Sequence, residues 1–519
     1  MLIDARSVPK DKIVETDICI VGAGAAGITL AREFIGKSFR VCLLESGGLE
    51  LDQDSQALYK GENIGLPYSL QATRLRFFGG TTNHWAGYCR PLDEIDFQAR
   101  DWIPYSGWPF SRSHLDSFYE RAQSICQLGP YPYNVSFWDD PKSTPQLPFA
   151  GDTVVTTIFQ HSPPTRFGKV YRNEVIEAEN IKVYLHANVV NLETTRPAQR
   201  VTRLRVACFQ RPGFWVAAKI FILAAGGIEN ARLLLLSNSV QTSGLGNQND
   251  LVGRFFMEHL VLFEGEVLPS NPYFNVGLYM RHEHPVHKVP ITGALTLSAE
   301  TLRHEKLLNF SAFLRPTWGK GVASLKGLIS GLREKNYGDF VEHLGKVISE
   351  IDGVALAALG KVFKGGYPIE LLILENETEQ APNPASRITL AAERDSLGKN
   401  RVRLNWQLSA IDKRTIWRTH EIIGRELGRA GAGRLRVTLE RDDGTAIPSL
   451  TGGFHHMGTT RMHADPRKGV VNEKCRVHGV SNLFIAGSSV FPTSGHATPT
   501  LTIIALALRL ADQVKEILR

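Results

Sequence analysis

The chain has 519 residues, of which 43% are hydrophobic and 21% are charged, with a net charge of +7 and a pI near 9.0. This length exceeds what one hydrophobic core usually serves, and it predicts two domains of a soluble enzyme. The basic residues are dispersed, with no block that would track phosphates, so nucleic acid is excluded as the expected partner. A basic surface would still suit an anionic lipid or an acidic electron-transfer protein, but a merely solvated surface is the favoured interpretation.

The cysteine pattern indicates a reducing compartment. The six cysteines form no C-x-x-C pair and no metal-ligand spacing. Residues 1–6 carry neither a signal-peptide core nor a twin-arginine pair, and no apolar run approaches the ~18 residues that span a bilayer. We therefore expect a cytoplasmic protein, in which membrane contact is not favoured.

Residues 16–48 have the pattern of a strand, a helix and a second strand, predicted at 18–21, 25–34 and 40–44. Gly22, Gly24 and Gly27 connect the first strand to the helix, and such glycines let the backbone approach a pyrophosphate at the helix N-terminus. Glu45 ends the second strand, near the position ~20 residues on at which an acidic residue binds a ribose hydroxyl. The motif predicts a dinucleotide site and disfavours NADP, but it does not separate FAD from NAD.

The middle of the chain is rich in predicted strands. Ser111 is expected to cap a helix that runs towards Ile125. Segments 266–310 and 370–408 predict a second sheet. Alternation with a period of two predicts a β-meander within residues 181–224, with strands at 182–185, 201–208 and 215–223.

Residues 323–364 are predicted to be helical. From 339 to 362, apolar side chains recur with the period of a helix, and Lys346, Glu350 and Lys361 lie on the other face. A lid or bracing helix on a substrate domain is the simpler interpretation. A helix that lies on a membrane surface is the alternative, since such helices are also amphipathic and basic.

The C-terminal residues 453–507 carry the strongest chemical signal. His455 and His456 precede a glycine-threonine turn, and His496 and Thr498 lie in a second turn that opens an apolar helix. Histidine is suited to proton transfer because its pKa lies near neutrality. A metal site is not expected, because the histidine spacings match no zinc pattern and no cysteine or carboxylate completes a set. The Ser488 segment lacks the G-x-S-x-G elbow of serine hydrolases.

Three further segments resemble the glucose–methanol–choline (GMC) oxidoreductases. Residues 222–234 are similar to the second FAD-contacting segment of that family, 482–493 to its C-terminal flavin strand, and 379–406 to a substrate-domain signature of its bacterial members. Because these segments follow the family's order, the chain is identified as a bacterial-type member. Its flavin loop is nearest to the branch of pyranose 2-oxidase and the sugar dehydrogenases.

The resemblance implies an α/β fold with an FAD-binding Rossmann-like domain and a mixed α+β substrate domain. The FAD-binding domain is expected to be discontinuous. The implied boundaries are 1–100, 165–262 and 452–519 for the FAD-binding domain, 101–164 for a crossover segment, and 266–451 for the substrate or cap domain with its helical insertion at 323–364.

The resemblance also implies FAD as the cofactor. The loop from Gly79 to His84 is similar to the flavin-facing loop of pyranose 2-oxidases, in which the matching histidine is covalently bound to the flavin. His84 is therefore either the anchor of a covalent FAD or a histidine that packs on the flavin ring. The implied cofactor-binding residues are Gly22, Gly24, Gly27, Glu45, Gly79, Gly80, Thr82, Asn83, His84, Val189, Ala225, Gly226, Gly487, Ser488 and Thr500.

The catalytic histidine of the family aligns with His455, and His456 is the second choice. The second catalytic residue, Asn or His in relatives, falls at Thr498, whose hydroxyl reaches less far than an amide. His496 is the alternative partner. His463 is a further departure, because relatives usually have glycine there.

These residues imply oxidation of an alcohol, preferably a sugar or glycoside hydroxyl, to a carbonyl. A histidine would accept the hydroxyl proton while FAD takes the hydride, and oxygen, a quinone or an electron-transfer protein would then accept the electrons. Two alternatives stay open. The altered turn at Thr498 is compatible with a non-oxidative elimination or cyclisation, and helix 339–362 with docking of a dehydrogenase subunit on a membrane complex.

Overall fold

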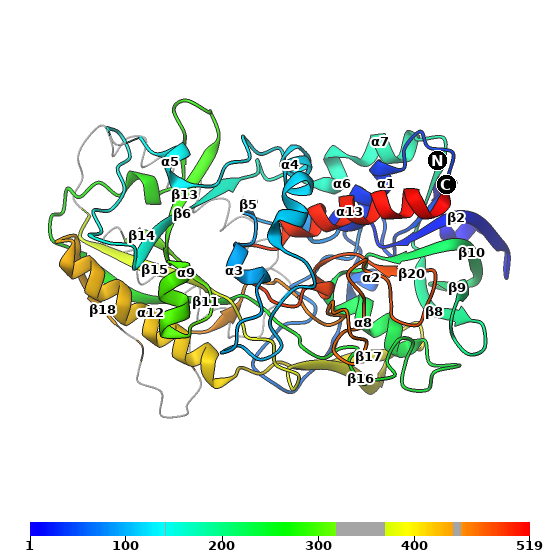
Figure 1. Ribbon diagram of the computed structural model, residues 1–519. Helices are drawn as coiled ribbons and strands as arrows, with labels where there is room; N and C mark the ends of the chain where they lie inside the picture. The colour runs from blue at the N-terminus through cyan, green and yellow to red at the C-terminus, as the bar shows by residue number, and fades with distance from the viewer. Residues whose placement is uncertain (141, 318–368, 438, 440–446, 448) are drawn as a thin grey trace.

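The computed structural model describes residues 1–140, 142–317, 369–437, 439, 447 and 449–519. The predicted helix 339–362, like the whole insertion 323–364, lies outside the described residues. Figure 1 shows two halves, one with the long helix α13 (Thr500–Leu518) and the other with α12 (Ala410–Arg429). Among the described residues, no helix combines the length and the apolar character needed to cross a bilayer.

An eight-stranded sheet occupies the half that holds both termini. Its order is β1-β7-β3-β2-β10-β9-β8, and β20 pairs with β10. Pairing is parallel from β1 to β10 and at β20, whereas β9 and β8 run antiparallel. The strands are β1 (Leu2–Asp4), β2 (Ile13–Val21), β3 (Val41–Leu44), β7 (Ile181–Leu185), β8 (Asn188–Thr194), β9 (Val201–Cys208), β10 (Arg211–Leu223) and β20 (Leu483–Ile485).

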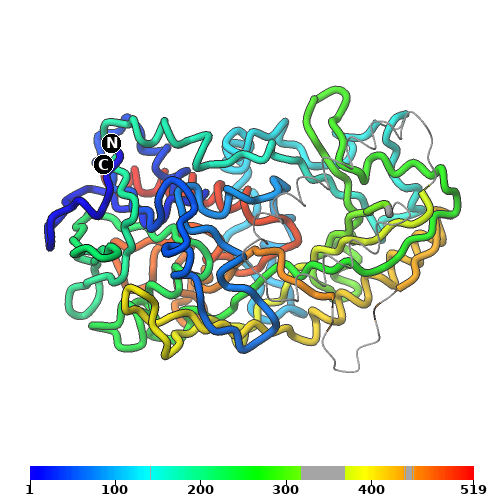
Figure 2. Tube along the Cα trace, turned by 180° about the vertical axis from the view of Figure 1, so that it is seen from behind, coloured from blue at the N-terminus to red at the C-terminus, as the bar shows by residue number. Residues whose placement is uncertain are grey.

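The parallel strands β2 and β3 are buried where they pair, as expected when helices cover both faces of a sheet. Helix α1 (Ala25–Glu33) connects these two strands, so the predicted strand–helix–strand unit is confirmed. Helix α13 packs against α1 and α4 (Asp116–Ile125), and Ser111 caps the short helix that leads into α4. The termini lie close together in Figure 1 and, seen from behind, in Figure 2.

The predicted β-meander is wrong in one of its three strands, the one predicted at 182–185. Ile181–Leu185 pairs in parallel with β1 and β3, and the meander is formed by β8, β9 and β10. The sequence prediction missed β8 altogether. Alternation of side chains identifies a strand but says nothing of its partner, and here the chain turns at His186, which has a φ of 58°.

The second half is built on a nine-stranded antiparallel sheet of order β18-β11-β15-β14-β13-β6-β5. Strand β12 pairs with β13, and β19 pairs with β11. The predicted crossover segment contributes β6 to this sheet. The strands are β5 (Tyr88–Cys89), β6 (Val154–His161), β11 (Leu260–Pro269), β12 (His282–Glu283), β13 (Pro290–Leu297), β14 (Phe310–Thr317), β15 (Leu371–Thr378), β18 (Gly433–Arg436) and β19 (Thr451–Gly452).

The strands β16 (Arg387–Arg394) and β17 (Asn400–Asn405) do not join the second sheet, contrary to the prediction for 370–408. They form a separate three-stranded sheet with β4 (Gly61–Asn63), beside α8 (Gly226–Leu236). Within the described residues, the other α-helices are α2 (Gln53–Ala57), α3 (Glu94–Phe97), α5 (Val135–Trp138), α6 (Phe167–Val170), α7 (Arg172–Glu177) and α9 (Ala299–Glu305).

A buried ion pair anchors the segment after α3. The guanidinium of Arg100 donates to both carboxylate oxygens of Glu379, at 2.8 and 2.5 Å, and both side chains are inaccessible to solvent. The backbone N–H of Asn309 donates to the same carboxylate at 2.9 Å. Because Arg100 lies between β5 and β6 and Glu379 directly follows β15, this contact fixes the segment after α3 against the second sheet.

Asp96, buried in α3, predicts a stability that falls as the pH rises. Burial, followed by the nearby carboxylates of Glu379 and Asp93, raises the pKa of Asp96 to about 8. The folded protein therefore holds a proton that the unfolded chain, with an ordinary carboxyl pKa near ~4, releases earlier. This contribution to stability is complete below about pH 4 and is lost as the pH rises through about 8.

Thermal unfolding measured from about pH 6 to about pH 9 should therefore show a falling Tm in the wild-type protein, and Asp96→Asn should flatten that fall because its side chain carries no titrating proton. An equally steep fall in the variant would contradict the assignment to Asp96.

Candidate active site

Three strands of the first sheet end side by side in front of an open space. Strands β2, β10 and β20 pair in register up to their carboxyl ends. Each is followed within three residues by a glycine, namely Gly24, Gly226 or Gly487. A Cβ added at any of the three would meet no atom within 4 Å. The carboxyl edge of a parallel sheet is where α/β proteins bind nucleotides, so this space is a candidate cofactor site.

The turn between β2 and α1 has the geometry of a dinucleotide-binding turn. Gly22 has a φ of 104°, and a Cβ on Gly27 would lie 1.9 Å from the carbonyl oxygen of Gly22, so α1 packs directly on the turn. The carboxylate of Glu45 accepts hydrogen bonds from the backbone N–H groups of Ala23 and Gly47, both at 2.9 Å. Glu45 is thereby fixed next to the turn, as a residue that binds a ribose hydroxyl requires.

The loop that holds His84 lies on this turn. The backbone N–H of Gly79 donates to the carbonyl of Ala23 at 2.8 Å, and a Cβ on Gly80 would lie 3.1 Å from the Cα of Gly24. Thr82 and Asn83 hold the loop through hydrogen bonds to its own carbonyls. Burial, together with Arg166, lowers the pKa of His84 to about 4, so its ring is neutral near pH 7.

The other predicted cofactor residues surround the same strand ends. Ala225 caps α8, and Ser488 donates to the carbonyl of His456 at 2.6 Å. Thr500 is the first residue of α13. Taken together, the open glycines, two helix N-termini and the fixed carboxylate fit the pyrophosphate and ribose of FAD.

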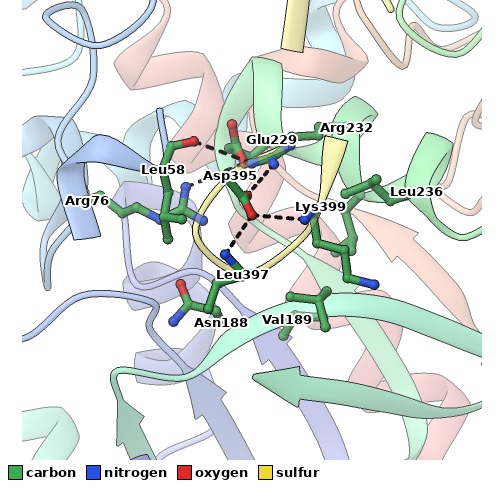
Figure 3. A pocket seen from close by; sticks show the side chains of 12 residues that line it. Leu58, Arg76, Asn188, Val189, Glu229, Arg232, Leu236, Asp395, Leu397 and Lys399 are labelled. Atoms are coloured by element: carbon green, nitrogen blue, oxygen red, sulfur yellow. Dashed lines mark hydrogen bonds and ion pairs between the residues drawn. The ribbon is translucent and has the colours of Figure 1, made fainter. Parts of the chain in front are cut away.

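A small cavity next to Val189 is too narrow for a cofactor ring (Figure 3). Its volume is about 30 Å³, which holds about one or two water molecules. Arg232 and Asp395 form an ion pair at its wall, at 2.6 Å. Asn188 also lines it, and within the described chain neither polar atom of this amide has a hydrogen-bond partner. A bound water would satisfy Asn188.

His455 lies in a cluster with His259 and Glu377. Its Nδ1 is 2.9 Å from Nδ1 of His259 and 3.5 Å from Oε1 of Glu377, and the last two residues are 3.3 Å apart. Burial, followed by the neighbouring His259, lowers the pKa of His455 to about 3, so the ring is neutral. Burial opposes the charged form of His259, but the hydrogen bond that its charged ring donates to Glu377 outweighs it and raises the pKa of His259.

Hydrogen-bond partners define the proton positions in the neutral state of this cluster. When His259 is neutral, its Nε2 donates to the carbonyl oxygen of Ser494 at 3.3 Å, and its Nδ1 is left as an acceptor. Nδ1 of His455 then donates to it. Because a neutral imidazole carries one ring proton, Nε2 of His455 keeps a free lone pair. This is the form of histidine that can accept a proton.

The side chain of His456 makes its hydrogen bond outside this cluster. Its Nε2 is 2.6 Å from the hydroxyl of Tyr68, which also hydrogen bonds to Glu258. The other carboxylate oxygen of Glu258 accepts from the backbone N–H of His455 at 2.8 Å. Burial raises the pKa of Glu258 to about 7 and lowers the pKa of His456 well below its usual value. His456 therefore supports the turn, while the side chain of His455 is more exposed, at 22% against 8%.

The two candidates for the second catalytic position differ in the groups they leave free. The hydroxyl of Thr498 donates to the carbonyl of Tyr88 at 2.6 Å, so its only proton is used within the protein. Nε2 of His496 is 3.0 Å from the carboxylate of Asp93, and its buried Nδ1 has no partner among the described residues. Burial raises the pKa of Glu377, but the hydrogen bond from His259 and the charges of His259, His455 and His496 outweigh this and lower it.

The prediction from the sequence differs from the structure in two respects. It did not identify five residues of this site, which are named below. It also rejected a metal site, because no carboxylate completed a set of ligands. The structure supplies that carboxylate in Glu377, whose ligand atom lies within 4.8 Å of those of both His259 and His455. His463 and His478 lie apart from this cluster and bond to backbone groups. The missed residues are Tyr68, Asp93, Glu258, His259 and Glu377.

Comparison with known proteins agrees with this geometry. Residues 17–243 match the family described as FAD dependent oxidoreductase, and residues 382–507 match the family described as GMC oxidoreductase. The chain is 23% identical to the fructose dehydrogenase large subunit of Gluconobacter japonicus, with 97% of this chain and 98% of the relative covered. It is 22% identical to 2-methyl-1,2-propanediol dehydrogenase of Mycolicibacterium austroafricanum, with 96% and 95% covered.

A solved structure shows the same fold. The crystal structure of pyridoxine 4-oxidase from Mesorbium loti superposes with a TM-score of 0.55 at 18% identity, over 96% of this chain and 99% of that one. The resemblance inferred from the sequence motifs is therefore confirmed, as are the α/β class and FAD as the cofactor. The chain is similar to GMC oxidoreductases along its whole length and is an FAD-dependent oxidoreductase that acts on alcohol groups.

Proposed function

We propose that this enzyme oxidises a hydroxyl group of a sugar or glycoside to a carbonyl, with His455 as the base. The observation that carries the proposal is the cluster of His455 with His259 and Glu377, in which Nε2 of His455 keeps a free lone pair when His259 is neutral. Bound FAD would supply the hydride acceptor. The segments 1–100, 165–262 and 452–519 would hold FAD, with 101–164 crossing to the substrate domain at 266–451.

His455 would take the hydroxyl proton at Nε2. As it does so, Nδ1 of His455 continues to donate to His259, and the carboxylate of Glu377 stabilises the positive charge that develops on the ring. His496 is the better second residue. Its Nε2 is held by Asp93 and its buried Nδ1 has no partner among the described residues, whereas the hydroxyl of Thr498 already donates its hydrogen bond to Tyr88.

The sugar assignment rests on two observations. The loop from Gly79 to His84 resembles that of the pyranose 2-oxidases, and a relative that aligns along the whole chain is a fructose dehydrogenase. A panel of sugars, glycosides and simple alcohols, tested with oxygen and with a dye as acceptor, would identify the substrate class. Turnover of simple alcohols alone would refute the sugar assignment, and carbonyl products that form without any acceptor would point to non-oxidative chemistry.

His84 is proposed to bind FAD covalently. Its loop lies on the dinucleotide-binding turn, and its neutral ring offers a nitrogen lone pair for the bond. That bond would replace a C–H bond of the flavin 8α-methyl group, with the proton leaving to solvent and the electron pair passing through the flavin to oxygen. Acid precipitation of the purified protein should leave the yellow flavin in the pellet. His84→Ala should bind FAD in the native state and release it to the supernatant in acid. Release from the wild-type protein would show that His84 only packs on the ring.

A further inference from the structure

We propose that His259, Glu377 and His455 form a binding site for a divalent transition-metal ion, and that an ion bound there switches the oxidation off. The three candidate ligand atoms are Nδ1 of each histidine and Oε1 of the carboxylate. Two imidazoles and one carboxylate are a donor set that suits Zn²⁺ and its neighbours in the first row. A fourth position is left for water.

The distances between the ligand atoms fit an ion after a small adjustment of one ring. They are 2.9, 3.3 and 3.5 Å. Ligand atoms that bind one zinc ion at ~2.0–2.2 Å with near-tetrahedral angles lie ~3.3–3.5 Å apart. The distance of 2.9 Å between the two imidazole nitrogens is the shortest, and it requires only a small rotation of one ring. Access is from the side of His455, because His259 is fully buried.

The surroundings of His259 match those of a metal-binding histidine. Such residues usually donate their second ring N–H to a carbonyl or carboxylate, which fixes the ring and the tautomer. Nε2 of His259 donates to the carbonyl of Ser494, so Nδ1 points its lone pair at the cluster. The backbone of His455 is likewise fixed, through the bond from its N–H to Glu258.

The effect on catalysis follows from which ring nitrogen of His455 carries the proton. Without an ion, His455 carries its proton on Nδ1 and its lone pair on Nε2. When Nδ1 binds an ion, the single proton of the neutral ring must reside on Nε2. His455 can then donate a hydrogen bond at that atom but cannot accept the hydroxyl proton. This inhibitory step rests on the proposed role of His455 as the base, whereas the binding of the ion does not.

Zinc titration of the metal-free holoenzyme by calorimetry, without substrate, tests the site directly. We expect one ion per chain, with binding at least ~10-fold weaker in Glu377→Gln and in His259→Gln. His287→Gln is the matched control, because His287 stacks on His284 at a separate histidine pair. Zinc binding that survives in Glu377→Gln and disappears in His287→Gln would overturn the site.

Two further measurements guard against misfolded variants and separate the two parts of the proposal. Anomalous diffraction at the zinc edge from wild-type crystals should place the ion between the three ligand atoms, and an ion found elsewhere would overturn the site. Zinc should also slow flavin reduction in the wild-type enzyme, and EDTA should restore it. Bound zinc that leaves the rate of flavin reduction unchanged would overturn the inhibitory step. A zinc-free enzyme in which substrate fails to reduce the flavin would instead contradict the proposed oxidation.

Discussion

Replacement of His455 by alanine is expected to lower the rate of flavin reduction by ~10²-fold or more, the usual scale for the loss of a general base. FAD should stay bound, because the glycines and Glu45 that would hold it lie at the strand ends of the first sheet and do not contact this ring. Stopped-flow measurement of flavin reduction under anaerobic conditions gives this rate separately from reoxidation.

His463→Ala is the matched control for that experiment. His463 lies in the same C-terminal segment and its ring accepts a hydrogen bond from the backbone of Asp465, outside the cluster. Its variant should reduce flavin at close to the wild-type rate. If His455→Ala kept the wild-type rate, and His496→Ala or His456→Ala lost it, the base would have to be reassigned.

Replacement of Glu379 by glutamine is expected to lower the free energy of unfolding by about 3–5 kcal/mol, because it leaves the buried guanidinium of Arg100 without its counter-charge. The two side chains are 1% and 0% exposed, so water cannot take the place of the lost carboxylate. Chemical denaturation at a fixed FAD concentration measures the change.

Glu393→Gln provides the comparison for an exposed ion pair. Glu393 is 63% exposed and pairs with Arg401 at 2.8 Å, so its loss should cost about 0–1 kcal/mol. A double replacement, Arg100→Met with Glu379→Leu, should recover much of the stability because no unpaired charge remains. Equal losses in Glu379→Gln and Glu393→Gln would contradict the role given to the buried pair.

Local patterns in the sequence predicted the cofactor half of the molecule well. The strands and helix around Gly22, Gly24 and Gly27 were predictable because the glycines, the apolar strands and the helix period all lie within one short segment. The partner of a strand is not a local property. Strand β7 was therefore placed in the meander, and β16 and β17 in the second sheet, although both predictions had found real strands.

The residues that contact His455 were not predictable for the same reason. His259 directly precedes β11 and Glu377 lies near the end of β15, more than a hundred residues later in the chain. Antiparallel pairing puts Glu377 opposite Val261, and this register brings the carboxylate next to His259. A sequence shows neither strand register nor sheet order, so a carboxylate in the middle of a strand-rich segment gave no signal of its role.

The central claim, that this enzyme oxidises an alcohol by hydride transfer to FAD, is tested most directly by the visible spectrum of the purified protein during anaerobic mixing with sugars and glycosides. We predict that the protein is yellow as purified and that a substrate of this class bleaches the flavin, with recovery of the colour when an electron acceptor is admitted. A folded protein without flavin, or conversion of a substrate while the flavin stays oxidised throughout, would contradict the claim.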